Sequence, residues 1–150
     1  MANFSFKLDP VLSQRRAEED RCQQDLAKSL RQRMILRDQL RLMQQTITQS
    51  KGRLSDGLVG RVDVDRVLQF ARYSGQTTQR AHAFVARLSG IEKQIQAARQ
   101  KLMGAVRARK ALEMLRDRRY RQWKQGMQRR VDAQLDDLAL QRHARRAQES

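Results

Sequence analysis

Few residues in this chain have the types and the spacing that catalysis needs. His82 and His143 lie far apart, and neither has a neighbouring acid and nucleophile. Asp136 and Asp137 are adjacent, so on a helix they point to different faces and do not form a paired-carboxylate site. Residues 57–60, Gly-Leu-Val-Gly, lack the Lys-Ser/Thr pair of a phosphate-binding loop. We therefore predict no enzymatic activity and no cofactor.

Cys22 is the only cysteine, which rules out an intrachain disulfide and a cysteine-based metal site. A reducing cytosol is compatible with this usage. The N-terminus, MANFSFKLDP, has no basic region followed by a long apolar run, so we expect no signal peptide. No stretch of sequence approaches 18 apolar residues, so we expect no membrane span.

The chemistry that remains is the binding of acidic groups. The formal net charge is +16, with 25 Arg and 7 Lys, and Arg favours two-pronged contacts with carboxylates or phosphates. Between Arg99 and Arg130 there are twelve basic and two acidic residues. On a helix these charges would lie nearly all round and repel one another, with few acids for pairing one turn away. We expect an acidic partner for this segment.

Three kinds of function fit such a chain. Nucleic acid is disfavoured because there is no recognisable binding module, and one Trp and two Tyr offer little to stack on bases. A membrane surface is disfavoured because no face of bulky apolar residues opposes the basic ones. The segment Ala111–Gln125 sets Leu112, Leu115, Tyr120 and Trp123 among arginines, which favours an acidic protein groove. Our first hypothesis is therefore a protein that binds an acidic protein partner. The alternative is a basic coiled-coil protein that binds nucleic acid. A third hypothesis is a structural coiled coil that only oligomerises.

Long helices must position these residues, because the chain is 32% charged, 5% aromatic and contains one Pro. Asp9 followed by Pro10 is a helix start signal. From Leu8 to Leu54, positions spaced by alternating fours and threes are apolar at nine of fourteen places. The spacing predicts a helix over about 10–51 with a narrow apolar seam.

A turn and a longer helix follow. Gly52, Gly57 and Gly60 predict a tip at about 52–63. A second helix is predicted over about 64–147, with Gly75 as the candidate for a break. Its apolar series, which includes Val67, Ala71, Val85 and Leu88 and continues to Leu138, drifts in spacing, so its seam wanders. The predicted fold is all-α and one domain: two long helices in an antiparallel coiled-coil hairpin, the second longer.

The register of this hairpin has two solutions. If the chain folds back near residue 59, Pro10 pairs near Ala108 and everything beyond overhangs as a lone helix. If residues 53–78 form a broader tip, the pairing shifts by roughly a dozen residues. Phe4 and Phe6 then cover Trp123.

Two motifs stand at the ends of the chain. The N-terminal FSFKLDPVLSQRRAEED alternates aromatic and polar residues, then has Leu, Val-Leu, Arg and Glu at helical spacing. The C-terminal KALEMLRDRRYRQW has a basic run with Leu-Glu-x-Leu, and LDDLALQRHARR, about twenty residues on, has an acidic pair followed by Leu-Ala and Arg. In this order the motifs resemble the FliJ family of bacterial flagellar export proteins, relatives of central-stalk-like proteins of type III secretion. The resemblance covers nearly the whole chain.

The resemblance implies a non-enzymatic component of the flagellar type III protein export apparatus. Members of the family form an antiparallel coiled coil resembling the rotor stalk of rotary ATPases. They bind the hexameric export ATPase FliI with the joined N- and C-terminal end and promote ring assembly, engage the export gate FlhA, and help to hand over export chaperones. The implied protein is cytoplasmic, at the cytoplasmic face of the inner membrane when assembled. It binds no specific nucleic acid and meets the membrane only through the gate.

The resemblance also suggests site residues. Those predicted to bind the ATPase are Arg116, Arg118, Arg119, Arg121, Trp123, Asp136, Asp137 and Leu138. Those predicted to bind the gate flank the tip and are Met43, Ile47, Phe70, Tyr73 and Phe84. Trp123 has an alternative role in packing against Phe4 and Phe6, and Met43 and Ile47 have one in the hairpin core.

Overall fold

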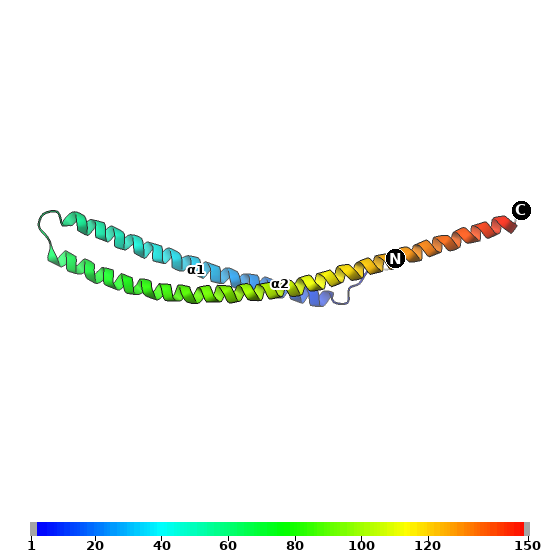
Figure 1. The fold of residues 1–150 in the computed structure, drawn as a ribbon, viewed down its shortest axis with the longest axis horizontal. Coiled ribbons are helices and arrows are strands. Elements are labelled where there is room, and N and C mark those ends of the chain that lie inside the picture. The colour runs from blue at the N-terminus through cyan, green and yellow to red at the C-terminus, as the bar shows by residue number, and fades with distance from the viewer. Residues whose placement is uncertain (1–2, 149–150) are drawn as a thin grey trace. The chain divides into compact units, whose positions relative to one another are not determined.

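The structure, a computed structural model, describes residues 3–148 and contains two helices. Helix α1 spans Asp9–Gly57 and α2 spans Val64–Gln148, with 49 and 85 residues. No strand occurs within the described residues. The predicted all-α hairpin with a longer second helix is confirmed (Figure 1).

The helices take part in two compact units. One is Asp20–Gly104, in which α1 and α2 run side by side from the connection at residues 58–63 (Figure 1). The other combines the described residues up to Glu19 with those from Ala105 onward. Arg33 pairs with Glu92 at 3.4 Å in the first unit, and Arg16 pairs with Glu113 at 3.0 Å in the second. Within each unit the segments of α1 and α2 are therefore antiparallel.

The seam of α1 lies where the spacing of apolar residues predicted it. Leu12 and Leu36 are buried, and nearly every predicted seam position is at least half-buried, while the rest of α1, apart from Leu30, is exposed. The main exception is Arg15, which pairs with Glu18 on the surface. The half-buried positions after Leu12 are Glu19, Cys22, Leu26, Ser29, Leu30, Arg33, Leu40, Met43, Ile47, Ser50 and Leu54.

The seam of α2 is more regular than predicted. It does not wander, because its covered residues follow steps of three and four from Val67 to Leu112 and so match the spacing of α1. Ala71 and Val85, placed on the seam by the apolar series, are exposed. The seam residues are Val67, Phe70, Ser74, Thr77, Ala81, Phe84, Leu88, Ile91, Ile95, Ala98, Leu102, Ala105, Arg109 and Leu112.

The connection is shorter than the predicted tip of 52–63. Helix α1 continues through Gly52 to Gly57, because one glycine costs a helix only about 1 kcal/mol and Leu54 is partly covered. Gly60 has a φ of 113°, a left-handed conformation that favours glycine. Asp63 then accepts hydrogen bonds from the backbone N–H groups of Asp65 and Arg66 at 3.1 and 3.4 Å, which starts α2 at Val64.

Helix α2 also passes without a break through Gly75, the predicted candidate for a kink. Thr77 and Thr78 there donate their hydroxyls to the carbonyl oxygens of Tyr73 and Ser74, both at 2.8 Å. Thr77 is buried in the seam. Tertiary packing therefore overrides the low helix propensity of this segment.

The pairing combines parts of both predicted registers. The connection is tight, as in the register that turns near residue 59. Phe4 nevertheless contacts Trp123, as in the register with the broader tip. Asp9 pairs with Arg116 at 3.6 Å. A turn near residue 59 predicted that the neighbouring Pro10 would lie near Ala108, so the observed pairing is shifted toward the C-terminal end of α2. Residues 3–8 are not helical. Extended backbone advances about 3.3 Å per residue, against about 1.5 Å in a helix, so a short segment reaches far along α2.

Candidate functional site

Four charged side chains link α1 to the basic segment of α2. Arg109 contacts Glu19 and donates to Glu113 at 2.6 Å, while Arg16 donates to Glu113 at 3.0 Å. The hydrogen bond with Glu19 raises the pKa of Arg109. The hydrogen bond from Arg16, together with the charge of Arg109, lowers the pKa of Glu113 below its usual range. The network fixes the register of α1 on α2 at this point.

The N-terminal segment covers one side of the basic segment of α2. Phe6 is only 3% exposed, and Phe4 packs its ring against Tyr120 and Trp123 with centroid distances of 5.3 and 5.8 Å. The guanidinium of Arg119 lies 5.7 Å from the centroid of the Phe6 ring, within the range of a cation–π contact. Trp123 thus packs against Phe4, one of the two residues named in its alternative role, and stays partly exposed.

The four predicted ATPase-binding arginines fall into two groups. Arg116 and Arg119 are engaged by Asp9 and Phe6. Arg118 and Arg121 instead line a shallow hollow of about 780 Å³ on α2, beside Met114, which is 73% exposed. We call this hollow the outer basic face. Its lining residues are Ala111, Met114, Leu115, Asp117, Arg118, Arg121, Gln122 and Gln125.

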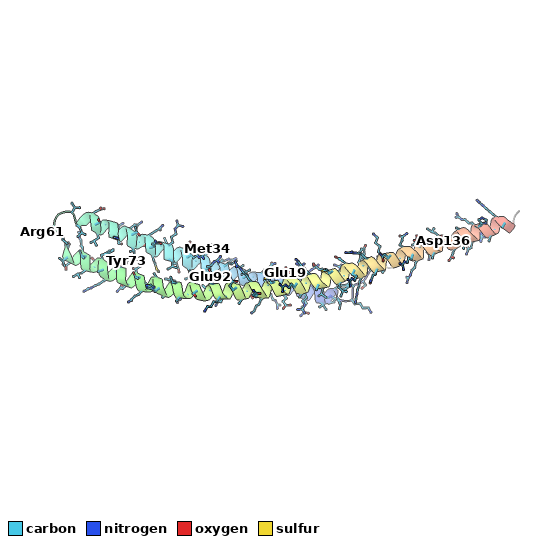
Figure 2. All side chains as sticks on the ribbon, in the orientation of Figure 1. Glu19, Met34, Arg61, Tyr73, Glu92 and Asp136 are labelled. Carbon is cyan, nitrogen blue, oxygen red and sulfur yellow. The ribbon has the colours of Figure 1, made fainter. Side chains whose placement is uncertain are left out.

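The last part of α2 is a single exposed helix. Every residue from 128 to 147 is exposed, and we call this range the C-terminal arm (Figure 1, orange to red). Asp136, Asp137 and Leu138 lie within it, and Figure 2 labels Asp136. Val131, Leu135, Leu138 and Leu140 are between 44% and 69% exposed. The arm therefore carries apolar side chains that the described residues of this chain leave uncovered.

The predicted gate-binding residues are also divided. Met43 and Ile47 line a groove of about 520 Å³ between the helices, with Ala81, His82 and Val85 on the other side. Phe70 and Phe84 are half-buried in the α2 seam. Tyr73 is 42% exposed, and Figure 2 shows it on the α2 segment near the connection. Phe70 therefore contributes to the helix seam, whereas Tyr73 is on the exposed side of α2, and their role in binding the gate stays a prediction.

Sequence reasoning placed a turn here but missed its exposed aliphatic side chains as candidate functional residues. Leu58, Val59, Val62 and Val64 are 40%, 88%, 55% and 64% exposed. The available signal was an unusual composition, because four aliphatic residues replace the polar residues expected in a glycine-rich turn.

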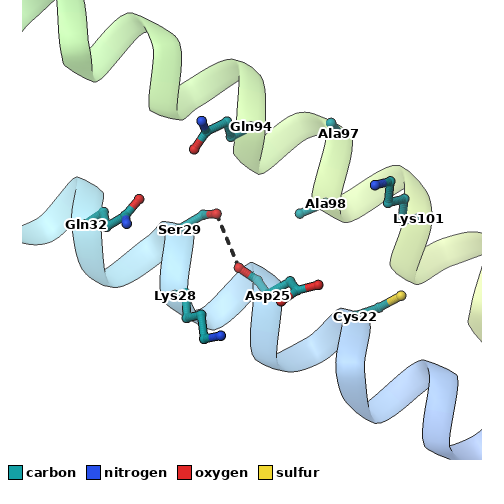
Figure 3. A pocket seen from close by; sticks show the side chains of 9 residues that line it. All are labelled: Cys22, Asp25, Lys28, Ser29, Gln32, Gln94, Ala97, Ala98 and Lys101. Atoms are coloured by element: carbon teal, nitrogen blue, oxygen red, sulfur yellow. Dashed lines mark hydrogen bonds between the residues drawn. The ribbon is translucent and has the colours of Figure 1, made fainter.

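The groups with reactive chemistry do not converge. Cys22 is a half-buried free thiol that lines a groove of about 410 Å³ with Asp25, Gln94 and Lys101 (Figure 3). Ser29 there donates its hydroxyl to the carbonyl oxygen of Asp25 at 3.2 Å. Among residues 3–148, no group of three or more His, Cys, Asp or Glu could hold a metal ion. No helix in the same range is long and apolar enough to cross a bilayer.

Comparison with known families covers almost the whole molecule. The family model described as "Flagellar FliJ protein" matches residues 4–148. The chain belongs to the FliJ family. No curated protein and no solved structure gives a significant match. Membership of the FliJ family makes this protein a component of flagellar protein export that belongs to a non-enzymatic family.

Proposed function

We propose that this protein binds the flagellar export ATPase FliI through the outer basic face and the C-terminal arm, and that it promotes assembly and activity of the ATPase ring. It acts in the cytoplasm, at the inner face of the membrane. The hairpin end that carries the connection at residues 58–63 binds the export gate FlhA and export chaperones.

One observation carries the ATPase proposal: the C-terminal arm is a helix with no covering segment in residues 3–148 and with uncovered Leu and Val side chains. A lone helix of this kind is marginal in water, so a partner is expected to complete it. A single helix is about 10–12 Å wide, which suits the axial channel of a ring.

The arginines of the outer basic face support an acidic partner. No intramolecular ion pair or hydrogen bond engages Arg118 or Arg121 in the described residues, and Met114 and Leu115 beside them offer apolar contact. Two-pronged Arg contacts with carboxylates combine well with such apolar anchors. The opposite side of α2 is occupied by Phe4 and Phe6, so the outer basic face is the side open to a partner.

The test is the rate of ATP hydrolysis by the export ATPase of the same organism, titrated with this protein at physiological salt. The natural chain is expected to stimulate hydrolysis. Arg118→Glu/Arg121→Glu is expected to weaken half-maximal stimulation by about tenfold or more, because two charge contacts become repulsive.

The matched control is Arg80→Glu/Lys93→Glu, which changes the net charge equally at exposed positions of α2 outside the basic segment. It should stimulate like the natural chain. Equal losses in both variants would reduce the effect to net charge, and absence of stimulation by the natural chain would contradict the proposal. Salt-sensitive binding of duplex DNA near physiological ionic strength would then favour the nucleic-acid alternative.

A further inference from the structure

The connection between the helices presents a cluster of exposed aliphatic side chains. We call Leu58, Val59, Val62 and Val64 the apolar tip. Val59 is 88% exposed, more than the other exposed large hydrophobic residues of the described chain. Burying one such side chain contributes roughly 1.5–3 kcal/mol. Four of them within seven residues contribute little to this hairpin and offer much to a partner.

The apolar tip is held in shape from both sides. On the α1 side, the N–H of Leu58 donates to the carbonyl oxygen of Ser55 at 3.2 Å. On the α2 side, Asp63 caps the helix, accepts the N–H of Val67 through its carbonyl at 3.2 Å, and pairs with Arg66 at 3.4 Å. Gly60 supplies the left-handed turn between them. A loop ordered in advance loses little conformational freedom when it binds.

The charge around the apolar tip differs from that of the rest of the chain. Residues 51–68 contain four basic and three acidic residues, whereas the chain as a whole carries 32 basic and 16 acidic residues. An anionic lipid surface attracts a segment by about 1 kcal/mol per basic residue, so a nearly neutral tip gains little there. Nucleic acid would also attract this nearly neutral segment only weakly, because its phosphates are bound by excess basic residues.

The order of residues also disfavours insertion into lipid. Val62, Asp63, Val64 and Asp65 alternate, so Val62 and Val64 are each next to a carboxylate. Insertion of the valines into a bilayer would desolvate these carboxylates, which is costly without partners. A protein pocket can combine an apolar floor with donors at its rim, and such a rim would satisfy Asp65 and Asp56.

We infer that the apolar tip inserts into an apolar pocket with a basic or hydrogen-bond-donating rim in the cytoplasmic domain of the export gate. This inference rests on the gate binding proposed above and specifies which residues carry it. It moves the contact from Met43, Ile47, Phe70 and Phe84, which lie in the helix seams, to side chains that are free to meet a partner.

The first experiment places a probe at the tip of the full-length chain. Because Cys22 is the only cysteine, Cys22→Ser/Val59→Cys carries one thiol for an environment-sensitive fluorophore such as bimane. The labelled chain is titrated with the purified cytoplasmic domain of the export gate, with zwitterionic vesicles and with anionic vesicles. A blue shift with the gate domain alone is expected.

The second experiment measures affinity for the same gate domain by calorimetry. Val59→Ser/Val62→Ser is expected to weaken the Kd by more than about tenfold, because two buried aliphatic contacts are lost. Met34→Ser/Leu42→Ser is the matched control, since these side chains are 58% and 61% exposed on α1 (Met34 in Figure 2) and lie away from the tip. It should bind within about twofold of the natural chain.

Each other outcome overturns the inference in a recognisable way. If the natural chain binds the gate domain but the probe does not shift and Val59→Ser/Val62→Ser binds equally well, the tip is not the contact and gate binding stands. If the natural chain does not bind the gate domain, gate binding itself fails. A shift with vesicles alone would make the apolar tip a lipid contact.

Discussion

Glu113 accepts hydrogen bonds from arginines on both helices, Arg16 from α1 and Arg109 from α2. These contacts lower its folded-state pKa below that of an unfolded chain. A carboxyl whose pKa is lowered by folding stabilises the folded state above its unfolded pKa of about 4.3. That contribution is lost as the pH falls through the lower folded pKa.

At this residue scale we expect Glu113→Gln to lower the free energy of unfolding at pH 7, with a difference from the natural chain that disappears in acid. Urea unfolding followed by circular dichroism between pH 3 and pH 7 measures it. Glu18→Gln is the control, because Glu18 is exposed and its ion pair with Arg15 lies within one turn of α1. A difference for Glu113→Gln that is the same at every pH would contradict the electrostatic account.

At the scale of the helix, Gly90 and Gly104 have open space where a Cβ atom would stand. Neither is needed for the packing of α1 on α2. Gly90→Ala and Gly104→Ala are each expected to stabilise the fold by about 1 kcal/mol, which is the helix propensity difference. Gly60→Ala should destabilise it by a similar amount, since its φ of 113° suits glycine. Thermal unfolding measures all three, and a loss of stability in Gly90→Ala would show that the helices use that space.

The helices also show how far sequence patterns reach. The α1 seam was predictable because its apolar residues keep a regular spacing from Leu12 to Leu54. The α2 seam was not, because apolar residues that lie off it, such as Ala71 and Val85, compete with the covered positions in the sequence pattern. Val85 competed with the true seam residue Phe84. Packing against α1 decides between such neighbours, and single-sequence periodicity does not contain that contact.

The predicted sites were limited by the same missing information. Arg116, Arg118, Arg119 and Arg121 look alike in the sequence. Their different surroundings depend on the N-terminal segment, which meets α2 more than a hundred positions later in the chain. The apolar tip was overlooked because the turn was predicted from the spacing of its glycines. That spacing says nothing about how exposed the aliphatic side chains between them are.

At the scale of the whole molecule, the described N-terminal segment and the basic part of α2 meet around Trp123, the only tryptophan. Phe4→Ala/Phe6→Ala is expected to release this contact, because removal of a buried Phe side chain costs about 3–5 kcal/mol. The fluorescence emission of Trp123 should then shift to longer wavelength. Met114→Ala, on the outer basic face of the same part of α2, should leave the emission unchanged. An unshifted spectrum in the double variant would show that the segment does not shield Trp123.

The short connection at residues 58–63 also has a consequence for the order of folding. The contact of Arg33 with Glu92 spans 59 positions, that of Arg109 with Glu19 spans 90, and that of Arg16 with Glu113 spans 97. Closing a long loop in one step costs more entropy than extending an existing turn. We therefore expect the hairpin to nucleate beside the connection and to zip toward the chain ends. The contact of Phe4 with Trp123 would form last and open first, so the end proposed to meet the ATPase would also be the most easily remodelled.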